Sequence, residues 1–393
     1  MSDTSILIVD DELVRYSLSP DEDGNYTGEI DHTESQGTGY INTLRWSPDG
    51  KRLAFVSERS GTDPDRTNNA DLYVVDAAPG ATPVKLTTWS GPDANPVWSP
   101  DGQSIAYLQG SEPQLSAYSQ NTIAVVPSAG GAARLVAASL DRDVSGLTWT
   151  TDGTALRFLL GDDRAAHLAT VPVSGGVVTR LLDGRRAVSS YDASSTGRVV
   201  LNTATATRSS EVFAFENGAL RALTHVNDSI FTALSLGTTE DVQFKNKDGL
   251  TVGALLVKPA GFDASKKYPL MLRIHGGPNG QDQHAFSFER ELFAANGYLV
   301  LAVNYRGSSG RGQAWKKAIF ADWGNKEVQD LLAGVDHVIG LGIADPARLG
   351  MPKLFNAIRL RFIQTPQMDN MGKWGFIVTL CGINGFGQCP SRI

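Results

Sequence analysis

Short alternating apolar segments, each preceded by a similar polar turn, fill most of the first 225 residues. The turn WSPDG at Trp46–Gly50 precedes KRLAF, the same turn ending at Gly102 precedes QSIAY, and WTTDG ending at Gly153 precedes TALRF. A fainter fourth turn ends at Gly197 before RVVL, so the turn glycines recur at intervals of 52, 51 and 44 residues. Period-2 alternation predicts strands, and repeats of about 40 to 50 residues with several strands each are typical of β-propeller blades.

Each turn has a composition that ends one strand and begins another. Proline cannot continue a strand ladder, aspartate accepts local backbone hydrogen bonds, and glycine adopts positive φ. A second strand such as DLYVVD (Asp71–Asp76) and a short closing segment such as VKLT (Val84–Thr87) follow, which gives three strands per repeat, with a fourth expected in the linking segment. We expect the repeated Trp to pack between blades and the turn Asp to be structural. About four blades are recognisable; because propellers hold about four to eight, further blades are expected upstream.

The pattern changes after Val226, where longer apolar runs alternate with helical periodicity. In chain order it predicts a hairpin (Val242–Lys245 with Thr251–Lys258), a strand ending at Ile274, a helix over 285–296, a strand over Tyr298–Tyr305, a helix over Asn325–Ile339 and a strand entered at Asp345. Strand, helix and strand in succession imply parallel pairing. The runs ending at Ile274 and Tyr305 are apolar enough to be buried on both faces.

These patterns divide the chain into three parts. Residues 1–235 are expected to form an incomplete all-β propeller, residues 236–350 a partial α/β-hydrolase domain, and residues 351–393 an aberrant tail. The sequence Ile6–Glu12 (ILIVDDE) offers one competing interpretation, because it is similar to the first strand and acidic pair of a response-regulator receiver. Pro20 and Gly24 interrupt the next stretch of sequence and the repeats begin by residue 41, which favours a propeller strand instead.

Composition and charge exclude several classes of protein. A formal net charge of -7 and a pI near 5.4 argue against a nucleic-acid partner, which would require clustered Lys and Arg. No apolar run approaches the ~18 residues of a membrane-spanning helix, and Met1–Asp10 lacks the features of a signal peptide, so the location is unknown and a cytoplasmic one is the default expectation. Cys381 and Cys389 are the two cysteines, and no histidine follows His337, so neither a metal site nor a cofactor is expected.

An oxyanion-loop pattern is the strongest chemical signal. The apolar run of YPLMLRIHGGP ends in His275, Gly276, Gly277 and Pro278, which is how a buried strand opens onto the oxyanion loop of an α/β-hydrolase. Three further motifs follow in order: NYRGSSGRG (Asn304–Gly312), DWGNKEVQDL (Asp322–Leu331) and ADPARLG (Ala344–Gly350).

Together with the WSPDG repeats, these four motifs make residues 40–350 resemble the prolyl oligopeptidase family of serine peptidases, with its acylaminoacyl-peptidase and dipeptidyl-peptidase-like branch the nearest match. The resemblance implies a propeller that caps an α/β-hydrolase domain and restricts substrates to short peptides. It also implies a Ser-Asp-His triad, with the serine in a Gly-x-Ser-x-Gly-Gly elbow after the segment that matches ARLG.

Few residues inherit a role from this resemblance. His275 stands where some members have a tyrosine that donates to the oxyanion, and an imidazole N–H could do the same, although a His that packs the loop is the alternative. Gly276 and Gly277 would keep the backbone close to a substrate carbonyl. Arg306 is expected to brace loops near the active site. Trp323, His337 and His284 are expected to have no catalytic role.

The nucleophile that the family requires is missing from the sequence. No Gly-x-Ser-x-Gly occurs in the chain, and beyond Gly350 there is one serine, Ser391, and no histidine. Those 43 residues hold five basic residues and one acid, an abrupt change that resembles a shifted reading frame or a mis-joined gene. We therefore expect an incomplete, catalytically incompetent member of the family. A non-catalytic peptide- or protein-binding propeller is the alternative.

Overall fold

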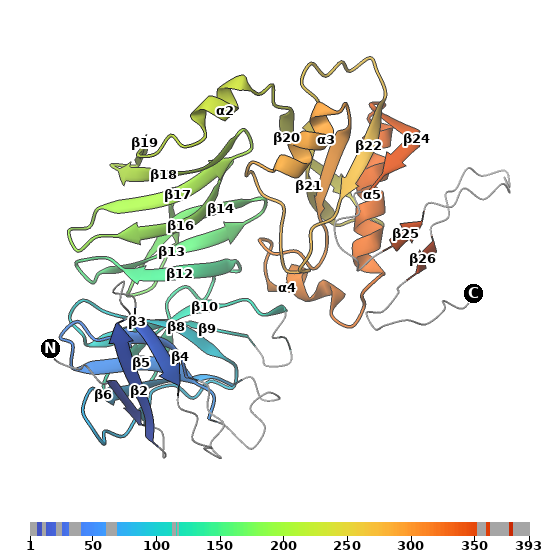
Figure 1. Cartoon of the computed structure of the whole chain (residues 1–393). Coiled ribbons are helices and arrows are strands. Elements are labelled where there is room, and N and C mark those ends of the chain that lie inside the picture. Colours follow the sequence, from blue (N-terminus) through green and yellow to red (C-terminus); the bar gives the residue numbers. More distant parts are fainter. Residues whose placement is uncertain are drawn as a thin grey trace.

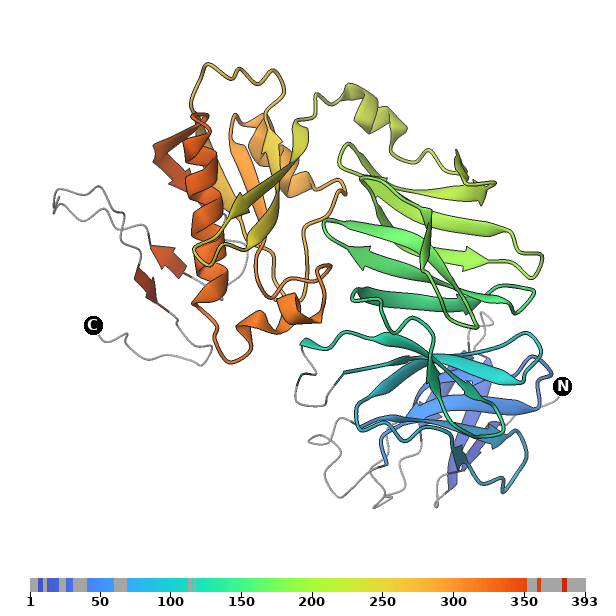
Figure 2. The same ribbon diagram turned by 180° about the vertical axis from the view of Figure 1, so that it is seen from behind.

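A computed structural model describes residues 41–59, 69–111, 115 and 118–351, together with the backbone of five further strands (Figures 1 and 2). Those five are β1 (Ile6–Val9), β2 (Leu13–Pro20), β3 (Tyr26–Ile30), β25 (Arg359–Arg361) and β26 (Ile377–Thr379). The receiver hypothesis, the aberrant tail and the cysteines fall mainly outside the described residues.

Each predicted repeat forms an antiparallel sheet of four strands, and the sheets lie one after another at the left of Figure 1. The strands are β4 (Ile41–Trp46), β5 (Arg52–Ser57), β6 (Asp71–Asp76), β7 (Val84–Lys85), β8 (Asp93–Trp98), β9 (Ser104–Gln109), β10 (Thr122–Pro127), β11 (Arg134–Leu135), β12 (Asp143–Trp149), β13 (Ala155–Asp162), β14 (Ala165–Pro172), β15 (Thr179–Leu182), β16 (Ala187–Ala193), β17 (Val199–Thr205), β18 (Arg208–Glu216) and β19 (Ala219–Ala222). In each repeat the linking segment forms the fourth strand, as expected, and this strand precedes the polar turn. One parallel pair, Ala166 with Ala187, joins the last two repeats.

The repeated turns have the geometry that their residues predict. Asp49 accepts from the Ser47 hydroxyl at 2.6 Å and from the Lys51 backbone N–H at 3.1 Å, and Gly50 has φ +70°. Asp101 and Asp152 make the same two kinds of bond in their own turns. The hydroxyl donor and then the backbone N–H lower the pKa of Asp49. The turn carboxylates therefore stabilise hairpins, as expected.

Two of the repeated tryptophans connect neighbouring sheets. The Trp98 indole N–H donates to the Arg45 carbonyl and that of Trp149 to the Val97 carbonyl, both at 3.0 Å. The packing prediction is wrong for Trp46, which is 49% exposed. Trp46 belongs to the first WSPDG repeat, and the described residues contain no WSPDG repeat before it that could supply an equivalent carbonyl.

The second part of the chain is a five-stranded sheet in the order β20-β21-β23-β22-β24. Its strands are β20 (Thr238–Lys245), β21 (Thr251–Lys258), β22 (Tyr268–Arg273), β23 (Leu299–Asn304) and β24 (Ala344–Gly350), preceded by the short helix α2 (Asp228–Ala233). The predicted hairpin is β20 with β21, and β22 pairs in parallel with both β23 and β24.

Helices cover both faces of this sheet, as Figures 1 and 2 show from opposite sides. Helix α5 (Lys326–Gly340) packs on the larger core cluster, which includes Leu301 and Leu272, whereas α3 (Phe288–Ala295) packs on the smaller cluster around Val300. Every residue of β23 is buried, as predicted. In β22 only Leu270 and Leu272 are buried, so the expectation of burial on both faces is wrong there. The eight-residue α3 contacts β21 and β23 and leaves that face of β22 partly open.

The helix predictions differ from the structure mainly at one boundary. Helix α3 begins at Phe288 rather than at residue 285, because Ser287 is its N-cap and accepts from the Arg290 N–H at 3.4 Å. Its C-cap is Asn296, as predicted, and Gly297 follows with φ +81°. Within the described part of the chain, no helix combines the length and apolarity needed to cross a membrane.

A loop and a short helix join the two parts of the molecule. After β23 the chain runs through Asn304–Gly312 into α4 (Gln313–Lys316) and the 3₁₀ turn Lys317–Ile319, at the centre of Figure 1. The Lys316 ammonium, 5% exposed, contacts Asp143 Oδ1 of the first part at 2.6 Å and donates to the Ser119 carbonyl at 2.6 Å. This loop therefore reaches from the edge of the sheet to the ends of the propeller strands.

Candidate active site

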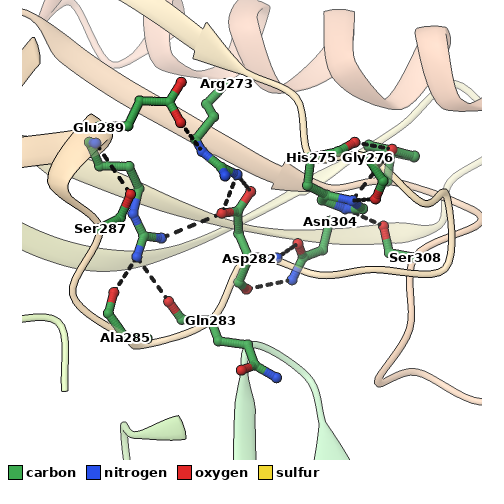
Figure 3. Close-up of polar contacts among 12 residues, drawn as sticks. Arg273, His275, Gly276, Asp282, Gln283, Ala285, Ser287, Glu289, Asn304 and Ser308 are labelled. Carbon is green, nitrogen blue, oxygen red and sulfur yellow. Dashed lines mark hydrogen bonds and ion pairs between the residues drawn. The ribbon is translucent and has the colours of Figure 1, made fainter. Parts of the chain in front are cut away.

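The predicted oxyanion loop and the NYRG loop meet at the carboxyl ends of β22 and β23 (Figure 3). His275 follows β22, whereas Tyr305 and Ser308 follow β23. Because the two strands are parallel neighbours, their carboxyl ends lie at the same edge of the sheet, where α/β proteins place ligand sites.

His275 is held by three contacts. Its ring stacks on Tyr305 with centroids 4.5 Å apart, Nδ1 lies 3.0 Å from the Gly276 carbonyl oxygen, and Nε2 lies 2.9 Å from Ser308 Oγ. A carbonyl can only accept, so Nδ1 carries the proton and Nε2 accepts from the Ser308 hydroxyl. Burial lowers the pKa of His275, which favours the neutral ring that this arrangement needs. Ser308 was not among the residues expected at the site, although it lies inside the NYRGSSGRG motif.

The loop leaves backbone donors available. Within the described residues, the N–H groups of Gly276 and Gly277 make no hydrogen bond. Gly277 has φ +133°, and a side chain there would bring a Cβ within 2.6 Å of the Gly280 nitrogen. Pro278 follows in the same loop. In this tautomer both ring nitrogens of His275 are engaged, so the free donors of the loop are backbone ones.

An acid and two arginines fix the loop from the side of α3 (Figure 3). Asp282, 6% exposed, receives hydrogen bonds from Arg273 to both carboxylate oxygens, and Arg290 lies 3.7 Å away. The Asp282 N–H donates to Asn304 Oδ1 at 2.8 Å and Asn304 Nδ2 returns a bond to the Asp282 carbonyl at 3.0 Å. Glu289 accepts from Arg273 Nε at 3.1 Å. No local sequence pattern indicates this network, because its members come from different elements.

Arg306 lies at the centre of a second network, beneath the NYRG turn. Its backbone N–H and its guanidinium both donate to Asp330 of α5, with Nη2 2.9 Å from Oδ1. The same guanidinium binds Asp248 in the β20–β21 turn and donates to the Lys326 carbonyl at 3.1 Å. Burial alone would lower the pKa of Arg306, but the hydrogen bonds and charges of Asp330 and Asp248 raise it. The guanidinium thus ties three elements together.

Comparisons with known proteins agree with this arrangement. A profile described as the prolyl oligopeptidase family matches residues 284–352, which include Arg306 and Ser308. Dipeptidyl-peptidase 5 of Porphyromonas gingivalis is 28% identical over 328 residues, covering 79% of this chain and 46% of that protein. Residues 284–352 belong to the prolyl oligopeptidase family.

Other members extend the comparison. The peptidase YuxL of Bacillus subtilis is 30% identical over 206 residues, covering 52% of this chain and 31% of that protein. An acylaminoacyl peptidase of Pyrococcus horikoshii superposes with a TM-score of 0.68 at 22% identity, over 86% of this chain and 50% of that one. A second acylaminoacyl peptidase, solved in complex with Z-Gly-Gly-Phe-chloromethyl ketone, has the same score at 21% identity, over 89% of this chain and 54% of that one.

The structural similarities confirm the coarse fold prediction, a sheet-rich propeller part followed by an α/β-hydrolase part. The chain spans less than half the length of the Porphyromonas and Bacillus relatives.

The three residues expected to have no catalytic role make side-chain contacts with residues outside the oxyanion loop. His284 Nε2 contacts Asp241 at 3.0 Å, His337 stacks on Phe244 at 5.7 Å, and Trp323 donates to the Tyr118 hydroxyl. Among the residues that the structure describes, no group of three or more His, Cys, Asp or Glu side chains is arranged to hold a metal ion.

Proposed function

We propose that the chain carries the oxyanion-loop half of a serine peptidase site and that this 393-residue polypeptide does not itself cleave peptide bonds. The observation that supports the second statement is the burial of Ser308. It has a histidine base 2.9 Å away, yet it is 0% exposed, so a substrate carbonyl cannot approach its hydroxyl. Elsewhere the sequence lacks a Gly-x-Ser-x-Gly elbow.

In this proposal the backbone of the loop does the work of the oxyanion site. The N–H groups of Gly276 and Gly277 would donate to the oxygen of a substrate carbonyl as it gains negative charge, and a preorganised donor of this kind is worth ~3 to 4 kcal/mol in serine hydrolases. His275 and Pro278 would hold the loop in place, with the His275 ring acting through the backbone rather than as a donor. Arg306 would brace the neighbouring turn.

Short peptides are the proposed ligands. The relatives are peptidases by name, and one similar structure holds a peptide chloromethyl ketone. We also propose a boundary between residues 235 and 236, because the segment between α2 and β20 separates the last propeller sheet from the α/β sheet. In this division residues 1–235 form the propeller, 236–350 the peptidase domain and 351–393 a tail of different character.

Peptide binding without cleavage is the second candidate function. It is supported by the backbone N–H groups of Gly276 and Gly277, which make no hydrogen bond within the described residues and are available to a peptide carbonyl without any cleavage. Peptide binding requires no nucleophile, whereas the serine peptidase site of the first candidate requires one for its chemistry.

Labelling with a fluorophosphonate tests the proposal. The full polypeptide should remain unlabelled and should show no turnover of aminoacyl or N-acyl aminoacyl chromogenic substrates above background. Labelling at Ser308, or turnover abolished by Ser308→Ala or Ser391→Ala, would contradict the proposed incompetence.

A further inference from the structure

Arg311 makes no hydrogen bond or ion pair within the described part of the chain. It lies in the loop between β23 and α4, and its guanidinium carbon is 3.8 Å from the centroid of the Trp315 ring. Nη1 is buried and makes no hydrogen bond, and the guanidinium forms no ion pair with any described residue. The side chain as a whole is partly exposed, but a buried N–H without an acceptor is rare in proteins, because it costs ~1 to 3 kcal/mol. The orphaned Nη1 therefore points to an acceptor that the described residues do not supply.

The backbone on both sides of Arg311 is fixed by the propeller. The Gly310 N–H donates to Asp143 Oδ2 at 3.1 Å, and the Gln313 N–H donates to Asp141 Oδ1 at 2.8 Å. Gly312 has φ +92°, and a Cβ there would lie 2.1 Å from Asp141 Oδ2. Arg311 is consequently held at the junction of the two parts.

Two acids act on Arg311 electrostatically without pairing with it. Asp163 lies 3.3 Å from the Arg164 guanidinium, and Asp330 is bound by Arg306 at 2.9 Å. Partial burial, the largest cause, lowers the pKa of Arg311.

We propose that Arg311 binds a carboxylate of a peptide ligand at the junction between the propeller and the α/β sheet. A guanidinium offers a planar pair of donors that matches a carboxylate, and stacking on Trp315 orients that plane before binding. The carboxylate belongs either to the C-terminus of the peptide or to an Asp or Glu side chain. The inference rests on the proposal that peptides are the ligands, but it needs no cleavage.

Calorimetric titration of the full polypeptide distinguishes these sources. The probes are acetyl-Ala-Ala, its C-terminal amide, and acetyl-Ala-Asp-amide. Acetyl-Ala-Ala should bind at least about tenfold more tightly than its amide, as expected for one charge-assisted hydrogen-bonded contact. Tight binding of acetyl-Ala-Asp-amide as well would assign the site to carboxylates in general. Tight binding of acetyl-Ala-Asp-amide alone would assign the site to side-chain carboxylates, whereas equal affinity for all three probes would overturn the proposal.

Arg311→Gln should weaken binding of the acid about tenfold to a hundredfold and leave the weak binding of the amide unchanged. The matched control is Arg348→Gln, because Arg348 is exposed and pairs with Asp345 on β24, the last strand of the sheet. Arg311→Lys, which keeps the charge but loses the planar fork, should also weaken binding and serves if Arg311→Gln fails to fold. Binding that is unaffected by either Arg311 variant would overturn the proposal.

The rival explanation is an ion pair between Arg311 and Asp163 that serves the fold. In that case Arg311→Gln and Asp163→Asn would lower the melting temperature by similar amounts without ligand. We expect Arg311→Gln to leave the melting temperature within about 2 °C of the parent, since it removes a partly exposed charge that makes no ion pair with a described residue. A failure of these binding tests would not change the fluorophosphonate result. The proposal for Arg311 and the proposal of catalytic incompetence can therefore be refuted independently.

Discussion

The Nε2 atom of His275 lies 2.9 Å from the hydroxyl oxygen of Ser308, and both side chains are buried. With Nδ1 bonded to the Gly276 carbonyl, the ring has one tautomer that satisfies both contacts. A histidine in a predicted oxyanion loop therefore acts here as an acceptor toward a serine. The pair resembles a nucleophile and its base, but it stabilises a loop.

Removing the Ser308 hydroxyl should change the state of His275. In Ser308→Ala the Nε2 lone pair loses its donor, which costs ~1 to 3 kcal/mol for a buried polar atom. The ¹⁵N chemical shift of Nε2 should move toward that of an unbonded imine nitrogen, and the free energy of unfolding should fall by this amount. Ser309→Ala is the matched control, since the described hydrogen bond of Ser309 is a backbone one to Gly280. An Nε2 shift that stays the same in Ser308→Ala would refute the assigned tautomer.

Asp143→Asn should loosen the junction between the two parts. The substitution leaves the buried Lys316 ammonium without its carboxylate, and we expect a loss of ~1 to 3 kcal/mol, less than for a fully buried pair because Asp143 is 27% exposed. Chemical denaturation measures the loss. Lys317→Met, at an exposed neighbouring lysine, should change stability by less than ~0.5 kcal/mol. Equal effects of the two variants would show that the contact contributes nothing.

The carboxyl of Asp93 should make stability fall as the pH rises. Burial raises its pKa to about 7 from the ordinary 3.8, so the fold favours the protonated form. This contribution is present below about pH 4 and is lost as the pH passes 7. Asp93→Asn, which mimics the protonated acid, should therefore be more stable than the parent at about pH 8, by up to ~4 kcal/mol, with little difference near pH 4.

A turn carboxylate provides a control of opposite sign for Asp93. The Ser99 hydroxyl, and then the Gln103 N–H, lower the pKa of Asp101, so its contribution is present at neutral pH and is lost in acid. Asp101→Asn should destabilise the protein at about pH 7, with a difference that shrinks as the pH falls below about 4. Urea denaturation at about pH 3, 4, 6 and 8 checks both variants. If the stability difference from the parent changed with pH in the same direction for Asp93→Asn and Asp101→Asn, the opposite pKa shifts assigned to these two carboxyl groups would be contradicted.

Asp330→Asn tests the bracing by Arg306. Asp330 is 0% exposed and accepts from both the backbone and the guanidinium of Arg306, so the variant leaves a buried cation with one carboxylate, Asp248, in place of two. We expect a loss of ~3 kcal/mol in the free energy of unfolding, near the lower limit for breaking a buried pair. Asp336→Asn, on the exposed side of the same helix, should be nearly neutral. If Asp330→Asn left the free energy of unfolding nearly unchanged, the contact between Arg306 and Asp330 would not be stabilising the turn.

Local patterns allowed much of the fold to be predicted. The WSPDG turns, the β20–β21 hairpin and the apolar run of β23 depend on residues close in sequence, and the structure confirms them. The contacts around His275 do not follow from local pattern, since Ser308 and Asp282 reach it or its loop only after β22 and β23 pair. The partly open face of β22 likewise depends on how far α3 extends across the sheet.

The indole contacts between repeats have a consequence for how the propeller part tolerates change. Trp98 and Trp149 each bond to a main-chain oxygen of the preceding repeat, at the residue just before that repeat's own tryptophan position. The rotation between neighbouring sheets is therefore set by hydrogen bonds to backbone carbonyl groups. These groups are present whatever side chains the sheets carry. Substitutions on the sheet faces can accumulate without altering this rotation. Replacing one indole should change the rotation between the two sheets that it connects and leave the other pairs of sheets unchanged.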